Sequence, residues 1–320
     1  MNKSLRIVFM GTPEFAVATL DALLKSRHKV VGIVTVPDKP ANRGLKLQAS
    51  AVKEFAVKNN LPVLQPEKLK SEEFISALKE LKPDLQVVVA FRMLPEIVWA
   101  LPKLGTINLH ASLLPQYRGA APINWAVING EKETGITTFF ITHKIDTGDI
   151  LIQEKIAIEE NDDAGSVHDK LMTLGAELVV KTLDCIADAS DALQTQKQVV
   201  SEELKPAPKI FREDCKIDWG GSTDNVYNFI RGLSPYPGAY TELINEEGEK
   251  LTLKIFKTAK HIDLVLPAGQ LLVSDINQLL IGCEDGALEI IELQAEGRKR
   301  MRAIDFLRGF PIHELNWKAV

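Results

Sequence analysis

Cysteine is scarce in this sequence of 320 residues. Its three cysteines, Cys185, Cys215 and Cys283, are widely spaced and odd in number, which predicts neither a disulfide framework nor a cysteine-based metal site. Cys185 falls in an apolar helical stretch and is expected in the core. Buried free thiols are typical of proteins from a reducing compartment.

Long apolar runs are missing as well. The longest ones, such as residues 85–91, are far too short to cross a bilayer, and no cleavage site of small residues follows Lys3 and Arg6. Contents of 45% hydrophobic and 25% charged residues are ordinary for a globular protein. We therefore expect a cytoplasmic protein with no membrane partner, and the length favours two domains.

The chain also lacks an excess of positive charge. Its net charge is −5, and residues 209–320 carry 14 basic against 17 acidic residues. Because the molecule as a whole is not attracted to nucleic acid, RNA binding would depend on local basic groups. Two segments qualify, residues 39–46 with Arg43 and Lys46, and residues 298–302. For each of them, a solvated loop is the simpler alternative.

The first part of the chain alternates short apolar runs with helical patterns. Strands are expected at residues 5–10, 32–36, 85–90 and 105–110, and helices after a capping Thr12 and at residues 50–59 and 71–81. Strands that are apolar on both faces are typical of a parallel sheet covered by helices. The alternation predicts a doubly wound, mostly parallel, Rossmann-like α/β domain.

The pattern changes further along the chain. An antiparallel strand pair at 137–142 and 150–158 and a long helix at 166–187 complete the first domain. A polar stretch follows, and then a helix at 223–231. Five short strands are expected after it, at 239–244, 250–257, 269–274, 278–283 and 286–293. Short, evenly spaced strands predict a small, OB-like β-barrel. The expected division is a catalytic domain at 1–188, a linker at 189–208 and a C-terminal barrel at 209–320.

Asn108 and His110 are the first residues that suggest chemistry. They lie two apart in a predicted strand, so their side chains project from the same face, while Ile107 and Leu109 point into the core. The strand ends here, at the edge where open α/β sheets bind ligands. Acyl transfer to an amine needs a donor for the oxyanion and a base for the proton, and an amide beside an imidazole can supply both.

Asp146 is the third candidate. It lies in a glycine-containing loop between two predicted strands, and a carboxylate near an imidazole favours the charged form of the imidazole. The sequence leaves open a second interpretation, in which Asp146 only caps its own loop.

The segment that follows His110 is rich in turn residues. Pro115, Gly119 and Pro122 predict an ordered loop that forms a wall of the same crevice, with a helix starting at Pro122. A purely structural crossover loop with a solvated Arg118 is the alternative.

These residues resemble the signature of the 10-formyltetrahydrofolate-dependent formyltransferases. The motif reads Asn108-x-His110-x-Ser112-Leu113-Leu114-Pro115-x-x-Arg118-Gly119, followed by Asp146. Over its full length the chain is similar to the methionyl-tRNA formyltransferase family, through Gly11-Thr12-Pro13-x-Phe15-Ala16, Arg118-Gly119-Ala120-Ala121-Pro122-Ile123, Asp146-Thr147-Gly148-Asp149, Ala207-Pro208-Lys209-Ile210 and Ile217-Asp218-Trp219.

The resemblance implies a role for each part of the chain. Asn108, His110 and Asp146 would be catalytic, and Ser112, Leu113, Leu114 and Pro115 would contact the folate. The formyl donor would be 10-formyltetrahydrofolate, without a metal. The acceptor would be initiator methionyl-tRNA, bound by Arg43, Lys46 and the barrel, with no obligatory protein partner.

Two segments depart from the family pattern. The loop Arg43-Gly44-Leu45-Lys46-Leu47 has one basic residue fewer than the frequent Arg-Gly-Lys-Lys-Leu, which should weaken phosphate contacts without abolishing them. Residues 90–95 are one residue shorter than usual and carry Arg92 near a customary glycine, so the folate pocket is expected to differ there.

Three rival functions remain open at this point. A formyltransferase acting on an amino sugar nucleotide or on glycinamide ribonucleotide would share the motif but would not need the basic loop at Arg43. A nicotinamide-dependent oxidoreductase fits poorly, because Gly11 stands alone without G-x-G-x-x-G. A tRNA-binding protein without catalysis would leave Asn108, His110 and Asp146 unexplained.

Overall fold

The computed structural model describes residues 3–41, 46–189, 194–200, 203–275, 277–310, 312 and 317–320. The chain forms two compact units, and each is assembled from three separate stretches of sequence. The first unit comprises Met1–Gly119, Gly135–Ile156 and His168–Pro206, and the second comprises Ala120–Thr134, Ala157–Val167 and Ala207–Val320.

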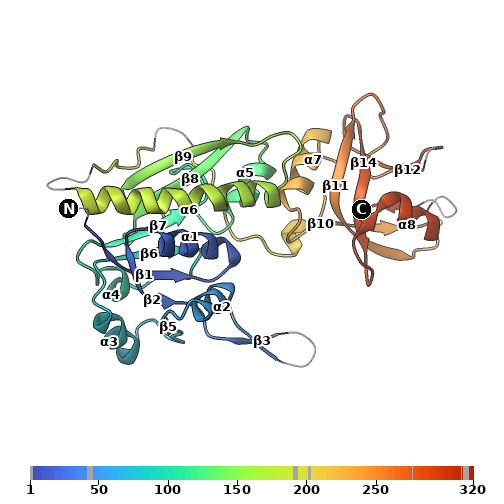
Figure 1. Cartoon of the computed structure of the whole chain (residues 1–320). Helices are drawn as coiled ribbons and strands as arrows, with labels where there is room; N and C mark the ends of the chain where they lie inside the picture. Colours follow the sequence, from blue (N-terminus) through green and yellow to red (C-terminus); the bar gives the residue numbers. More distant parts are fainter. Residues whose placement is uncertain are drawn as a thin grey trace. The chain divides into compact units, whose positions relative to one another are not determined.

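The first unit is built on a twisted sheet with the strand order β5-β2-β1-β6-β7-β8-β9 (Figure 1). The strands are β1 (Arg6–Gly11), β2 (Lys29–Val34), β5 (Val63–Leu64), β6 (Leu85–Val89), β7 (Thr106–His110), β8 (Glu133–Phe140) and β9 (Ile150–Ala157). The first five pair in parallel, and β8 runs antiparallel to β7. The predicted mostly parallel, Rossmann-like sheet is confirmed.

Helices lie against this sheet because its central strands are apolar on both faces; every residue of β6 is buried. The helices are α1 (Glu14–Lys25), α2 (Ala51–Lys58), α3 (Glu72–Glu80), α4 (Glu96–Trp99) and α6 (Ala164–Asp188). Ser50 and Ser71 cap α2 and α3 through their side chains. The predicted cap by Thr12 is wrong, since Pro13 occupies the N-cap of α1 and makes no side-chain cap bond.

Within the described residues, no helix is long and apolar enough to cross a membrane.

The buried imidazole of His28 joins the residue before β1 to α6. Its Nδ1 accepts a hydrogen bond from the backbone N–H of Leu5, and its Nε2–H donates to Asp184, both at 3.2 Å. Burial lowers the pKa of His28, and the Asp184 carboxylate offsets only part of that effect. The imidazole is therefore neutral in the folded protein near neutral pH.

Stability should consequently fall as the pH drops below about 6.5, because the unfolded chain then binds a proton that folded His28 does not. The loss should reach at most ~1.4 kcal/mol per pH unit and level off below the lowered pKa of the folded state. Urea unfolding at several pH values, compared with His28→Gln, measures it, since the amide can make both hydrogen bonds without titrating. The same pH dependence in the two proteins would contradict the assignment.

The second unit contains an antiparallel sheet that nearly closes into a barrel. Its strands are β10 (Ala239–Ile244), β11 (Lys250–His261), β12 (Leu271–Val273), β13 (Leu279–Gly282), β14 (Ala287–Ala295), β15 (Met301–Arg302) and β16 (Lys318–Ala319). The order is β12-β13-β14-β11-β10-β16, and an isolated bridge between Gln270 and Lys318 links the two ends. The predicted barrel is confirmed; β11 is longer than expected, and β15 and β16 were not predicted.

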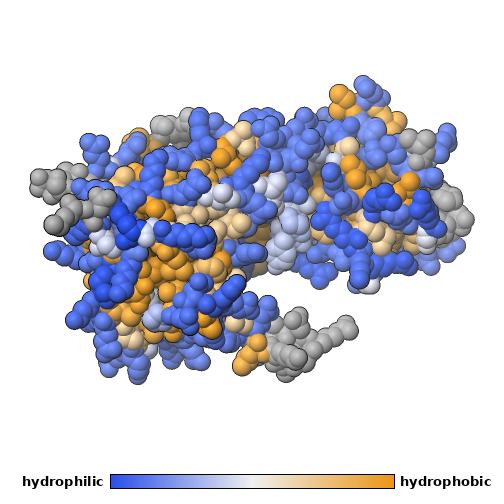
Figure 2. Space-filling model, viewed as in Figure 1, coloured by the Kyte–Doolittle hydropathy of each residue, from blue (hydrophilic) through white to orange (hydrophobic). Residues whose placement is uncertain are grey.

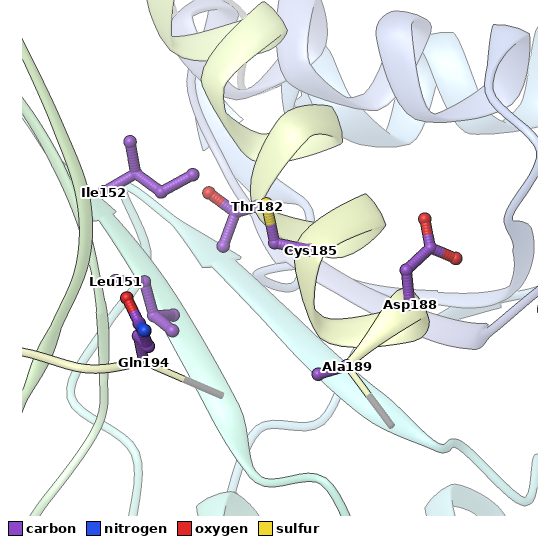
Figure 3. A pocket seen from close by; sticks show the side chains of 7 residues that line it. All are labelled: Leu151, Ile152, Thr182, Cys185, Asp188, Ala189 and Gln194. Atoms are coloured by element: carbon purple, nitrogen blue, oxygen red, sulfur yellow. The ribbon is translucent and has the colours of Figure 1, made fainter. Parts of the chain in front are cut away.

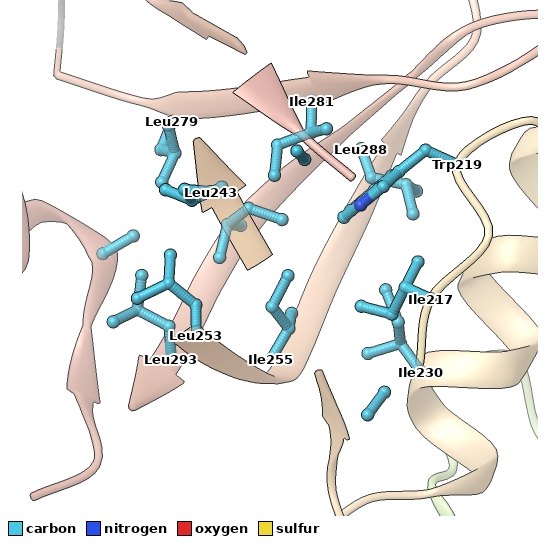
Figure 4. Packing of buried hydrophobic residues seen from close by; sticks show 14 of the residues in the cluster. Ile217, Trp219, Ile230, Leu243, Leu253, Ile255, Leu279, Ile281, Leu288 and Leu293 are labelled. Carbon is cyan, nitrogen blue, oxygen red and sulfur yellow. The ribbon is translucent and has the colours of Figure 1, made fainter. Parts of the chain in front are cut away.

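The barrel has its own core. Apolar side chains from β10, β11, β13 and β14 pack with Ile217, Trp219 and Ile230. Figure 4 shows these side chains gathered into one cluster between the strands and α7 (Thr223–Gly232). The indole N–H of Trp219 donates to the hydroxyl of Thr241 at 3.0 Å, which satisfies its one buried donor. The face of the barrel seen in Figure 2 is mostly hydrophilic, as expected for strands that alternate inward apolar and outward polar residues.

Two stretches from the middle of the sequence belong to this second unit. Helix α5 (Pro122–Ile128) packs closely on α7 (Thr223–Gly232), where a Cβ at Gly232 would lie only 2.5 Å from Ile128. The loop after β9 is held by Arg231, which donates to the carbonyls of Glu159 and Asp162 at 3.1 and 2.8 Å. The helix α8 (Ala303–Gly309) completes the unit.

Candidate active site

Asn108 and His110 lie near the carboxyl end of β7, as the sequence predicts. Ile107 and Leu109 alternate with them and are buried against the core. After β1 the chain adds β2 and β5 on one side of it and then β6 and β7 on the other side. The order in which strands are added therefore reverses between β1 and β6, although the strands stay parallel. Open α/β sheets bind ligands outside the carboxyl ends of the strands at such a point, and β7 is the next strand along.

The imidazole of His110 is held in one tautomer. Its Nε2–H donates to the backbone carbonyl of Tyr117 at 2.9 Å, and only 6% of the residue is exposed. A carbonyl can only accept, so the hydrogen is on Nε2 and the lone pair is on Nδ1. Nδ1 is therefore the nitrogen that can accept a proton.

Asp146 faces that nitrogen. Its Oδ2 lies 3.9 Å from Nδ1 of His110, which is an ion-pair distance rather than a hydrogen bond. The same oxygen accepts a hydrogen bond from the backbone N–H of Gly119 at 3.1 Å. The carboxylate can thus stabilise the imidazole when it is protonated, while the orientation of the ring is set by Tyr117.

Asn108 differs from its neighbours in having an available side chain. It is half-buried, and among the residues that the structure describes its amide has no hydrogen-bond partner. An amide N–H at this position can donate to a substrate oxygen without breaking a bond inside the protein.

The loop between β8 and β9 brings Asp146 to the site by folding back along the sheet. It begins beside the opposite end of β7, where the N–H of Ile141 donates to Thr106 at 2.8 Å. Asp146 adopts a φ of 52°, which aspartate tolerates better than most residues. Gly148 packs so closely that a Cβ would lie 1.6 Å from the carbonyl oxygen of Phe140.

The segment after His110 is fixed by hydrogen bonds. The hydroxyl of Ser112 is fully buried and donates to the carbonyl of Gln116 at 2.7 Å. Gln153 donates to the carbonyl of Leu114 at 2.9 Å, and Leu114 packs against Phe139. Ser112 and Leu114 therefore point into the protein, whereas Leu113 and Pro115 are partly exposed.

Two further side chains lie near this edge of the sheet, of which only the second, Arg92, was marked by the sequence. Gln198, in the stretch 189–208 that is predicted to be a linker, contacts the loop of Asp146. Arg92, in the segment that departs from the family pattern, donates to the carbonyls of Pro66 and Glu67 and lies 5.6 Å from the ring of Phe91. It ties the loop after β6 to the loop after β5.

Of the two residues expected to contact tRNA, the structure describes only the backbone of Lys46. Arg43 lies outside the described residues, between the short strands β3 (Lys39–Ala41) and β4 (Lys46–Gln48). The backbone of Lys46 begins β4, and nothing is described of its side chain.

A cavity of about 380 Å³ lies elsewhere in the first unit, between β9 and α6. Figure 3 shows Leu151 and Ile152 on one side, with Thr182, Cys185 and Asp188 on the other. None of the three candidate catalytic residues lines it. Cys185 is exposed here, so its predicted core position is wrong, while Cys215 and Cys283 are buried.

The fold and the site together define a class of protein. A Rossmann-like sheet ends in an amide donor, an imidazole of fixed tautomer and a carboxylate 3.9 Å away. These are the groups that acyl transfer to an amine requires. No group of three metal-ligating side chains occurs among the residues described.

Comparison with known proteins identifies the family. Residues 5–183 match the family described as formyl transferase, and residues 209–311 match the formyl transferase C-terminal domain. The chain belongs to the formyl transferase family. It is 54% identical to the methionyl-tRNA formyltransferase of Bacteroides fragilis over 98% of this chain and 97% of that protein. It is 50% identical to the enzyme of the same name from Flavobacterium johnsoniae, over 96% of both chains.

Solved structures share the fold. The sugar 3N-formyl transferase WlaRD superposes with a TM-score of 0.63 at 22% identity, covering 92% of this chain and 99% of that chain. HypX from Aquifex aeolicus in complex with tetrahydrofolic acid gives a TM-score of 0.63 at 18% identity, covering 95% of this chain and 47% of that one.

The close packing at Gly148 leads to a prediction. Gly148→Ala should lower kcat by about 100-fold, because the new Cβ would push apart Gly148 and Phe140 and so displace Asp146 by an ångström or more. Steady-state kinetics and thermal unfolding measure the effect. Gly309→Ala is the control, since a Cβ at Gly309 has nothing within 4 Å. Equal kcat values for the two variants would refute the argument.

Proposed function

We propose that this chain transfers a formyl group from 10-formyltetrahydrofolate to the α-amino group of methionine on initiator methionyl-tRNA, for translation initiation. The observation that carries the proposal is the similarity to proteins named methionyl-tRNA formyltransferase, which extends over 98% of the chain and so includes the barrel. A cytoplasmic location follows from a role in translation. No obligatory protein partner and no membrane partner are invoked.

The geometry supports a direct transfer. The amine nitrogen attacks the formyl carbon, and the bond between that carbon and N10 of the folate breaks. Asn108 donates to the formyl oxygen as it becomes anionic. His110 takes the proton of the attacking amine on Nδ1, and the carboxylate of Asp146 stabilises the resulting charge at 3.9 Å. The same proton can then pass to N10 as it leaves.

The folate is expected at the carboxyl ends of β1, β6 and β7. The segment Ser112 to Pro115 would contact it through its fixed backbone and through the exposed parts of Leu113 and Pro115, because the hydroxyl of Ser112 is already used inside the protein. Arg92 would shape the opposite wall by holding the loop after β6.

The tRNA is expected to contact the loop that carries Arg43 and Lys46, together with the barrel. Residues 209–320 are net acidic, so that contact would rely on local basic residues rather than on the whole surface.

An acceptor panel tests the proposal. The purified protein is supplied with 10-formyltetrahydrofolate and either methionine-charged initiator tRNA, uncharged tRNA, an amino sugar nucleotide or glycinamide ribonucleotide. Formyl transfer to the charged tRNA alone is the expected result. Transfer to a sugar nucleotide or to glycinamide ribonucleotide, without transfer to charged tRNA, would overturn it.

A further inference from the structure

Gln198 makes four hydrogen bonds that connect two loops of the first unit. Its Nε2 donates to the backbone carbonyls of Asp146 and Gly148, at 3.0 and 2.8 Å. Its Oε1 accepts from Nε and Nη2 of Arg118, at 3.2 and 2.6 Å. The side-chain amide can make two donor and two acceptor bonds, so all of its capacity is used.

The two loops that Gln198 connects are the ones that set the geometry of the candidate catalytic pair. Arg118 stands between Tyr117, whose carbonyl holds the imidazole of His110, and Gly119, whose N–H holds the carboxylate of Asp146. Gln198 lies in a third segment of the chain and contacts both the loop of Arg118 and the loop of Asp146.

That third segment is fixed independently of the site. Gln196 pairs with Ile150 through two backbone hydrogen bonds of 2.8 and 2.9 Å, which adds the segment to the start of β9. The side chain of Gln196 is exposed, whereas that of Gln198, two residues further, is half-buried. The two glutamines thus share a backbone environment and differ in what their side chains contact.

Gln198 holds the loop at Asp146 itself, where the backbone position sets the distance to His110. The φ of Asp146, 52°, lies in the left-handed region, and its carboxylate is 3.9 Å from His110 rather than in a hydrogen bond with it. Four of the residues before it, 142–145, are exposed. A backbone shift at Asp146 would change the distance between its carboxylate and Nδ1 of His110.

We propose that Gln198 is a positioning residue, which with Arg118 holds the Asp146 loop so that the carboxylate faces Nδ1 of His110. The proposal rests on the proposed function, in which His110 takes the proton of the attacking amine.

The test uses Gln198→Glu, Gln198→Ala and the control Gln196→Ala in the full-length protein. Glutamate keeps the acceptor for Arg118 but loses the donors to Asp146 and Gly148. We expect kcat to fall by about 10- to 100-fold in both Gln198 variants, with the KM for 10-formyltetrahydrofolate changed by less than about threefold. Gln196→Ala should keep the wild-type kcat.

A double-mutant cycle separates positioning from a general loss of stability. In that cycle, Gln198→Ala should cost little once Asp146→Asn is present.

The outcomes are distinguishable. Wild-type protein that transfers no formyl group to any acceptor would refute the proposed function itself. Active wild-type protein with an unchanged kcat in both Gln198 variants, or with additive losses in the double-mutant cycle, would refute the role of Gln198. Gln198→Glu, which preserves size and the contact to Arg118, decides the matter if Gln198→Ala folds poorly.

Discussion

His110→Ala should lower kcat for formyl transfer by about 100- to 10,000-fold, which is the usual contribution of a general base. The imidazole is buried, its tautomer is fixed by the carbonyl of Tyr117, and Nδ1 is the nitrogen that can take a proton. No other described imidazole shares this position, since the remaining ones that pair with carboxylates, His28, His143, His168 and His261, do so elsewhere. Single-turnover kinetics at saturating charged tRNA would measure the chemical step directly.

A matched control is available on the barrel. His261 also pairs with a carboxylate, Glu289, at 3.0 Å, and His261→Ala should leave kcat unchanged. Circular dichroism and thermal unfolding would show that His110→Ala is folded. A variant that turns over within threefold of the wild type would remove His110 from the mechanism.

Asn108→Ala should lower kcat by about 100- to 1000-fold, or roughly 3 to 4 kcal/mol, the usual effect of removing one oxyanion donor. The amide is half-buried and has no partner among the described residues, so the truncation should cost little stability. Because the oxyanion forms only in the transition state, kcat should fall while the KM for both substrates stays nearly constant.

Asn108→Ser offers the matched comparison, since a hydroxyl can still donate, though from a shorter side chain. Partial recovery of kcat relative to Asn108→Ala is expected. A raised KM with an unchanged kcat would instead mean that Asn108 binds the substrate in its ground state.

Much of the fold could be predicted because it depends on local patterns. The period of two along β7 places Asn108 and His110 on one face, and the serines at 50 and 71 mark helix starts that the structure confirms. Thr12 has the same capping chemistry, yet Pro13 takes the N-cap position of α1. Residue type alone does not decide which of two neighbouring residues ends up at a helix start.

The relations between distant segments could not be predicted in the same way. The distance from Asp146 to His110 depends on a loop that starts at the far end of β7 and folds back. The contact of Gln198 with that loop spans 52 residues and occurs in a polar stretch without a periodic pattern. Cys185 was misplaced because an apolar helical stretch does not reveal which of its residues faces solvent.

The interleaved course of the chain limits when each unit can fold. The second unit uses residues 120–134 and 157–167, but Arg231, which satisfies the carbonyls of Glu159 and Asp162, is synthesised much later. Those early stretches must remain without their partners until the last third of the protein emerges from the ribosome. A single cut at the polar stretch near residue 200 would therefore not yield two self-sufficient halves. For the same reason, exchanging the part after residue 200 between relatives would also require residues 120–134 and 157–167 of the same relative.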